Sequence, residues 1–277
     1  MGFFNFEKDG PGVSKDGPRK KGIFLFFELL GRKIGSFCGV NLLYFIISIP
    51  MVAVSFLASQ FFINYIKNIF GAEIGGVFFL QACQYAAFVS LVFIGSGPAS
   101  AALAYFNRAA VREEPIFLVA DFFEQFKKNF KQGIVVGILQ PLFTYAMIFG
   151  IFFYGVQYLT TGAVMWAVMM FLLILVWAVF ACSGFYIYQL MITFENSVIE
   201  LYKNAVILAL MNMPWNIVLS AVVLFINFLV FFTFTPVVSL ILAAVCWTAV
   251  MRFALEFYAA RYIQKNLIDK TKKSEEG

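Results

Sequence analysis

The sequence predicts an all-α membrane protein with about six transmembrane helices. Of its residues, 62% are hydrophobic and only 13% are charged, whereas a soluble domain carries about 25% charged residues. The apolar residues form long runs, and the basic residues cluster between alternate runs. A segment inside lipid must satisfy its own backbone hydrogen bonds, so apolar runs of this length indicate helices.

Six apolar runs are long enough to cross a hydrocarbon core, which takes about 20 helical residues. They cover residues 34–59, 74–93 with a continuation to 106, 133–154, 163–186, 215–234 and 237–258. An alternative with four spans requires the last two runs to form one re-entrant hairpin. We therefore expect a polytopic helical bundle.

The basic residues predict the orientation of this bundle. All but one of the 20 lysine and arginine residues fall on one side of it, and Lys67 stands on the other. Because positive residues mark the cytoplasmic side, both termini are expected in the cytoplasm. The net charge of +5 then reports topology and attraction to anionic lipid headgroups, not a nucleic-acid surface.

The chain divides into three parts. Residues 1–33 form a cytoplasmic and interfacial entry segment, 34–258 the transmembrane helical domain, and 259–277 a cytoplasmic tail. Turn-forming and charged residues predict irregular structure over 8–22. The apolar stretch that follows is interpreted either as a short interfacial helix or as the extended start of the first span.

A helix break is predicted at Gly97 and Pro98. A helix over 74–106 would reach about 50 Å, against a hydrocarbon core of about 30 Å. Proline is disfavoured inside a helix but favoured as its first residue. We expect one helix to end near Gly95 and the next to start at Pro98, with small residues that allow close packing.

Cytoplasmic amphipathic helices are predicted near residues 99–132 and 196–210. In the first, apolar residues recur every four positions and bases lie at the end of the segment, which suits the helix dipole. We interpret this stripe and its lysines, with Lys203 in the second helix, as partner-docking residues. They are Leu118, Phe122, Phe126, Lys127, Lys128, Phe130, Lys131 and Lys203.

Two further patterns flank these helices. Gly133 and Gly137 form G-x-x-x-G at the head of the third span, a packing signal. Lys128-Asn129 before the third span matches Lys203-Asn204 before the fifth. The match indicates either a parallel internal repeat, of a kind some transporters use, or a coincidence of two residues.

The residue types favour a protein that is not an enzyme and has no cofactor. The chain has no histidine, which excludes Ser-His-Asp and Cys-His arrangements. The four cysteines are far apart within spans and are expected to be small buried hydrophobes rather than metal ligands or disulfides. Arg252 and Glu256, one helical turn apart, are interpreted as an ion pair beside the membrane interface.

Uncharged polar residues occur within the spans. We interpret them as partners in interhelical hydrogen bonds, with a path for a sugar as the alternative. They are Asn41, Gln81, Gln84, Gln140, Thr144, Gln189, Asn227 and Thr233.

Five segments in fixed order resemble the YesL-like family of bacterial integral membrane proteins, a domain of unknown function. They cover residues 8–33, 41–50, 97–108, 121–132 and 198–210. One departure is the insertion of residues 51–96, where many members pass directly from the second segment to the third.

The resemblance implies a function through the neighbouring genes of family members. Members of the family look like companions of carbohydrate importers of the ATP-binding cassette type. It implies an accessory subunit in a bacterial cytoplasmic membrane that packs beside the permease subunits and, through its cytoplasmic helices, contacts permease loops or the ATPase. A stand-alone carrier or channel, an integral membrane enzyme, and a sensor or assembly factor are the alternatives.

Overall fold

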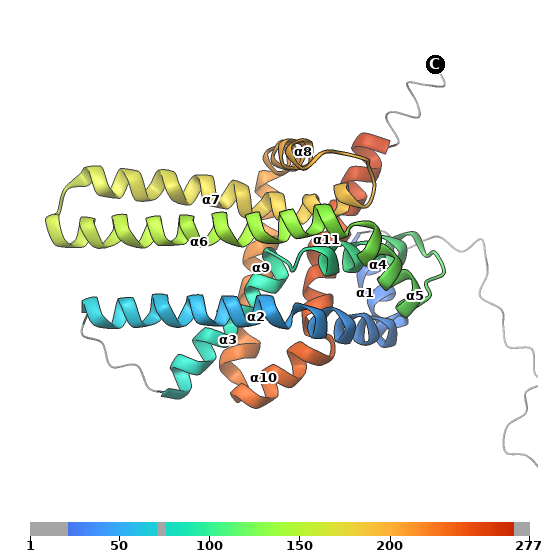
Figure 1. The fold of residues 1–277 in the computed structure, drawn as a ribbon, viewed down its shortest axis with the longest axis horizontal. Coiled ribbons are helices and arrows are strands. Elements are labelled where there is room, and N and C mark those ends of the chain that lie inside the picture. The colour runs from blue at the N-terminus through green and yellow to red at the C-terminus, as the bar shows by residue number, and fades with distance from the viewer. Residues whose placement is uncertain (1–21, 71–75, 269–277) are drawn as a thin grey trace, which may run out of the picture.

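The computed structural model describes residues 22–70 and 76–268, and within them the chain forms helices and no strand. Figure 1 shows the arrangement of these helices. The elements are α1 (Ile23–Arg32), α2 (Ile34–Phe70), α3 (Gly76–Phe93), α4 (Pro98–Arg112), α5 (Leu118–Lys128), α6 (Phe130–Thr161), α7 (Val164–Met191), α8 (Val198–Met211), α9 (Met213–Thr233), α10 (Pro236–Leu242), the π-helix η1 (Ala243–Trp247), α11 (Thr248–Ile263) and the π-helix η2 (Gln264–Ile268).

Six described helical stretches have the length and composition to cross a membrane, which confirms the all-α class. They are Ile34–Ile69, Gly76–Phe93, Phe130–Thr161, Val164–Met191, Met213–Thr233 and Pro236–Asn266. Several extend beyond the apolar runs, because helical hydrogen bonding continues into polar residues at the ends. The last one passes residue 258, so the expected tail begins inside a helix. The irregular stretch predicted over 8–22, apart from Gly22, lies outside the described residues.

The entry helix α1 is separate from the first span. Lys33 interrupts the helix between α1 and α2, so the extended-span alternative is wrong. Leu29 of α1 is buried, and the ring of Phe26 stacks on Phe253 of α11 at 5.2 Å between centroids. Apolar contacts of this kind hold α1 against the bundle.

The helices do not form a simple parallel bundle. Helices α2, α6 and α7 extend along the long axis of the molecule (Figure 1). Helices α1, α4 and α5 lie together at the end of the molecule that is opposite the connection between α6 and α7. Helices α9 and α11 cross this direction in the same view. An exposed ion pair between Arg32 and Glu113, at 2.6 Å, joins the ends of α1 and α4.

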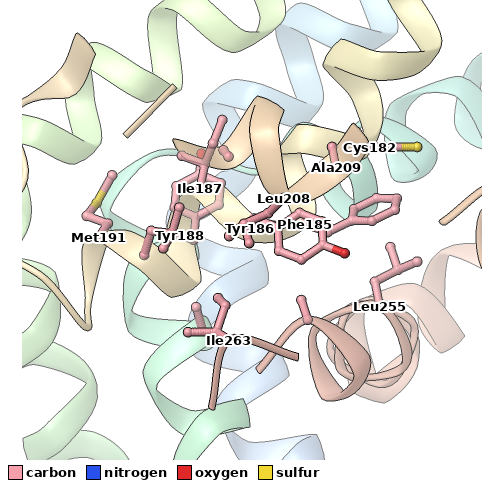
Figure 2. Packing of buried hydrophobic residues seen from close by; sticks show 14 of the residues in the cluster. Cys182, Phe185, Tyr186, Ile187, Tyr188, Met191, Leu208, Ala209, Leu255 and Ile263 are labelled. Carbon is pink, nitrogen blue, oxygen red and sulfur yellow. The ribbon is translucent and has the colours of Figure 1, made fainter. Parts of the chain in front are cut away.

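Two apolar clusters make up the core, and α4 and α11 contribute to both. One cluster joins the C-terminal end of α7 to α8 and α11. Figure 2 shows Phe185, Tyr186 and Tyr188 of α7 in this cluster, with Leu208 of α8 and Leu255 of α11. The other joins α1, α2, α3, α4 and α11 around residues such as Phe37, Phe88 and Phe253. Buried Ala99, Ala101, Ala102 and Ala104 in α4 let these neighbours approach closely.

The predicted helix break is confirmed, and the predicted G-x-x-x-G motif packs against it. Helix α3 ends at Phe93 and α4 begins at Pro98. A Cβ atom on Gly137 would lie 2.8 Å from the Gly97 Cα, and one on Gly133 would lie 2.8 Å from the Pro98 Cα. Since both obstacles are backbone atoms, only glycine fits at these two positions of α6.

Asn41 of α2 accounts for the π-helical turn η1. Its amide nitrogen donates to the carbonyls of Ala243 and Ala244, at 2.9 and 2.7 Å, and its side-chain oxygen accepts from the Ala249 N–H at 2.7 Å. A π-turn leaves backbone groups without their usual partners. One side chain therefore satisfies the irregular turn from a neighbouring helix.

The Lys128-Asn129 and Lys203-Asn204 pairs, from which a repeat or a coincidence was inferred, do not occupy equivalent positions in the structure. Asn129 separates α5 from α6, whereas Asn204 lies inside α8. The residue that occupies the position equivalent to Asn129 is Asn212, which separates α8 from α9 with similar backbone angles. In each case an amphipathic helix meets a span at a single asparagine.

Replacing Gly137 by alanine is expected to destabilise the protein by about 1–3 kcal/mol, because the added methyl group meets the Gly97 backbone. Thermal unfolding in detergent, followed by circular dichroism, measures this. Gly35→Ala in α2 is the control, since its Cβ meets open space. An equal loss in both variants would contradict the close contact.

Replacing Asn41 by alanine is expected to cost about 1–3 kcal/mol, because the Ala249 N–H and two carbonyls lose their partner in a buried site. Hydrogen exchange at Ala249 should become faster. Exposed Asn64 on the same helix is the control, and Asn64→Ala should change stability by less than about 0.5 kcal/mol. Unchanged exchange at Ala249 would show that η1 does not depend on Asn41.

Candidate functional site: a buried charged cluster

Arg252 and Glu256 form an ion pair inside the protein. Both lie on one face of α11, and Nη2 of Arg252 is 2.7 Å from Oε1 of Glu256. Each side chain is only 3% exposed. The i, i+4 pair is thus confirmed, and it is enclosed within the protein, with partners on α2, α3, α4 and α7.

All three nitrogens of the Arg252 guanidinium donate to acceptors. Nε and Nη2 donate to Glu256, while Nη1 donates to the Leu91 carbonyl at 3.1 Å and to the Ser100 hydroxyl at 3.4 Å. The guanidinium also lies 5.2 Å from the ring centroid of Tyr188 and 5.9 Å from that of Tyr44. Hydrogen bonds and aromatic faces together offset the cost of removing this cation from water.

Glu256 receives two amide donors from other helices. Its Oε2 accepts from Asn107 of α4 at 2.8 Å and from Gln189 of α7 at 3.1 Å. Gln189 also donates to the Ala104 carbonyl at 3.1 Å. The Asn107 side-chain oxygen is buried and has no partner among the described residues. One carboxylate therefore connects α4, α7 and α11.

The cluster surrounds the break between α3 and α4. Tyr188 donates to the Ile94 carbonyl and accepts from the Gly97 N–H, both at 3.3 Å. The Ser96 N–H donates to the Ser100 hydroxyl at 2.7 Å. Arg252 lies against the carboxyl end of α3, where the helix dipole favours a cation. These groups satisfy backbone atoms that the break would otherwise leave unpaired.

Gly95 makes the close approach of Arg252 possible. Its φ of +82° is in the left-handed region, which glycine adopts without strain. An added Cβ would lie 2.5 Å from the Ser100 hydroxyl and 2.7 Å from Nη1 of Arg252. The result is an enclosed charge pair on α11 whose hydrogen bonds reach both parts of the broken helix, α3 and α4, and the span α7.

The structure divides the predicted docking residues into two groups. Phe122 is buried, and Leu118 and Phe126 pack beside it against the second apolar cluster. Phe122 therefore stabilises the chain itself, whereas Leu118 and Phe126 remain partly exposed. Phe130 and the four lysines at 127, 128, 131 and 203 are exposed. Gly97 and Pro98 are buried at the break.

Other apolar residues in or beside α5 and α8 are exposed, and they are not among the docking residues predicted from the sequence. Phe117, Val119 and Phe123 are exposed around α5. On α8, Ile199, Lys203, Ile207 and Leu210 are exposed at spacings of four, four and three residues. The helical period could have indicated this α8 stripe.

Most of the predicted polar residues make interhelical contacts. Gln81 and Gln84 of α3 donate to the carbonyls of Phe234 and Pro236, and Asn227 of α9 accepts from the Trp247 indole at 2.9 Å. Gln140 of α6 accepts from the Tyr202 hydroxyl at 3.1 Å. Contacts between helices therefore involve most of these side chains, and Gln140 and Thr144 also line a cavity.

Removing one member of the pair should be more damaging than removing both. Arg252→Met leaves a buried carboxylate without its cation and should cost about 3–5 kcal/mol, as should Glu256→Leu. The double variant should lose less than either single variant, because it leaves no unpaired charge in the core. Unfolding in detergent, analysed as a double-mutant cycle, gives the coupling.

Arg261→Met is the matched control on the same helix, because Arg261 is exposed and lies 5.3 Å from the ring centroid of Phe257. Its loss should stay below about 1 kcal/mol. Additive losses at Arg252 and Glu256 would contradict the coupled pair.

Comparison with known proteins gives one match. Residues 37–156 match a family model described as a protein of unknown function, DUF624. The match begins in α2, includes the broken helix and α5, and ends within α6. No curated protein and no solved structure matches the chain. The matched region and the six apolar helices indicate a multi-pass membrane protein.

Proposed function

We propose that this protein is a non-catalytic membrane subunit of a carbohydrate importer of the ATP-binding cassette type, and that it packs against the permease subunits. Two lines of reasoning support this. The segments 41–50, 97–108 and 121–132, which resemble the YesL-like family, fall within the region that matches the DUF624 model. The outward surface of α5 and α8 supplies the chemistry of an interface.

The exposed stripe of α8 is the observation that carries the proposal. Helix α8 is not among the candidate spans, yet it exposes Ile199, Ile207 and Leu210 around Lys203. Protein interfaces have an apolar core and a polar rim. The three apolar side chains of α8 resemble such a core, and Lys203 is the polar group beside them. A lipid interface would be the alternative partner of this face.

Helix α8 is held rigidly enough to present that stripe. The Ser197 hydroxyl accepts from the Glu200 N–H, and the Glu200 carboxylate accepts from the Ser197 N–H at 2.8 Å, which completes a capping box. The backbone hydrogen bond from Ser197 lowers the pKa of Glu200. The cap is therefore expected to hold at neutral pH and to weaken only as pH falls through that lowered pKa.

A hydrogen bond connects the start of α6, which follows α5, to the segment that precedes α8. The Gln132 amide at the start of α6 donates to the Asn196 carbonyl before α8, at 2.6 Å. Exposed Lys128, Phe130 and Lys131 flank one side of this link, and Ile199 and Lys203 follow on the other. An acidic permease loop or ATPase surface would complement these lysines.

Co-purification tests the proposal. The tagged chain is expressed with the permease subunits of a carbohydrate importer from the same source, and the recovered permease is quantified. Ile199→Ser with Ile207→Ser should lower recovery at least tenfold, since each lost apolar anchor is worth roughly 1–2 kcal/mol. Ile199→Leu with Ile207→Leu keeps the face apolar and should retain binding.

A second arm tests the charges. Replacing Lys127, Lys128 and Lys131 by glutamine should lower recovery at low salt and reduce its dependence on salt, whereas arginine at the same positions should preserve both. A chain that purifies without permease under every condition would overturn the proposal. Binding that survives the α8 serine variant would remove that helix from the interface.

A further inference from the structure

A cavity of about 610 Å³ lies among the membrane-spanning helices, apart from the charged cluster and the exposed faces of α5 and α8. Residues of α2, α3, α6, α7 and α9 line it. Its volume falls within the range of about 300–1,000 Å³ that ligand sites occupy. The site is therefore large enough for a molecule rather than for isolated waters.

The walls of the cavity are made by specific contacts between helices. The rings of Phe62 of α2 and Phe152 of α6 stack at 5.9 Å between centroids, which brings these two helices together on one side. The hydroxyls of Ser90 of α3 and Tyr145 of α6 lie 3.3 Å apart. All four residues line the cavity. Tyr145 and Phe152 lie two turns apart on one face of α6, so both contacts bound the cavity on that face.

The lining is mainly apolar but holds two unpaired polar atoms. The Ser55 hydroxyl of α2 is buried, in a residue only 1% exposed, and it has no hydrogen-bond partner among the described residues. The Trp177 indole nitrogen of α7 is likewise buried and unpartnered in the described part of the chain. Buried polar groups without partners are costly, so each indicates a missing hydrogen-bonding group.

The unpaired atoms restrict the chemistry of the occupant. An indole N–H can only donate, so it requires an acceptor oxygen, and a serine hydroxyl can donate to one as well. The mainly apolar walls require a hydrocarbon body. Among the described residues, no charged side chain lines the cavity, so the buried part of the ligand is expected to be uncharged.

We infer that the cavity binds one acyl chain of a membrane phospholipid, with ester oxygens near Ser55 and Trp177. The six candidate spans carry many exposed apolar side chains, and in a membrane acyl chains are the most abundant molecules around such surfaces. Alkyl chains match the apolar walls, and ester carbonyls accept hydrogen bonds. A free fatty acid has the same alkyl body and is the competing source.

Fluorescence of Trp177 tests the inference on the purified full chain. In a variant that retains Trp177 but carries phenylalanine at Trp166, Trp215 and Trp247, a phosphatidylcholine brominated on one acyl chain is titrated in detergent. We expect saturable quenching at about one lipid per chain. A variant that retains only Trp215, which is exposed on α9, should be quenched in proportion to bulk lipid, without saturation.

A cavity-filling variant supplies the specific control. Ala178→Phe places a ring in the cavity and should abolish the saturable component, whereas Val176→Phe, at an exposed position of the same helix, should retain it. Both variants are checked for an unchanged unfolding temperature. The titration of the unfilled chain remains decisive if Ala178→Phe fails to fold.

Two outcomes would overturn the inference. Quenching of Trp177 that rises linearly, as it does for Trp215, would mean that bulk lipid alone reaches the indole. Saturation by brominated stearic acid but not by the phospholipid would assign the site to free fatty acids. The experiment contains no permease, so its result is independent of the proposed importer role.

Discussion

The ion pair between Arg252 and Glu256 is the interaction on which the remaining arrangement depends. The break between α3 and α4 leaves backbone groups unpaired in a region from which water is excluded, and each such group is costly. Arg252 satisfies the carboxyl end of α3, and Tyr188 bridges Ile94 and Gly97. Glu256 then connects α11 to α4 and α7, so one pair sets where the two apolar clusters meet.

Close backbone contacts transmit this arrangement to the rest of the molecule. Gly97 and Pro98 meet Gly133 and Gly137, so the position of the break determines the position of α6 and, through it, α7. Asn41 plays a similar part for the π-turn before α11. In lipid, where the hydrophobic effect does not drive helices together, small residues and satisfied polar groups supply the contacts between them.

The amphipathic helix α5 shows why an apolar stripe does not by itself identify a partner. Its most regular apolar stripe, which includes Phe122, packs against the second apolar cluster of the same chain. Burial there removes these apolar side chains from water without a partner protein. The side chains left outside, such as Val119 and Phe123, interrupt the pattern. Which face is free depends on how α4, α5 and α2 pack.

Four features of this protein could be predicted from the residues alone: the all-α class, the number of apolar helices, the break at Pro98 and the packing role of Gly133 and Gly137. Those features follow from local chemistry: hydropathy, proline geometry and the absence of a side chain. The packing of distant helices, by contrast, is what encloses Arg252 and Glu256, places Asn41 against η1 and surrounds a cavity with five helices. Each of these joins residues far apart in the chain, and no local pattern records which helices become neighbours.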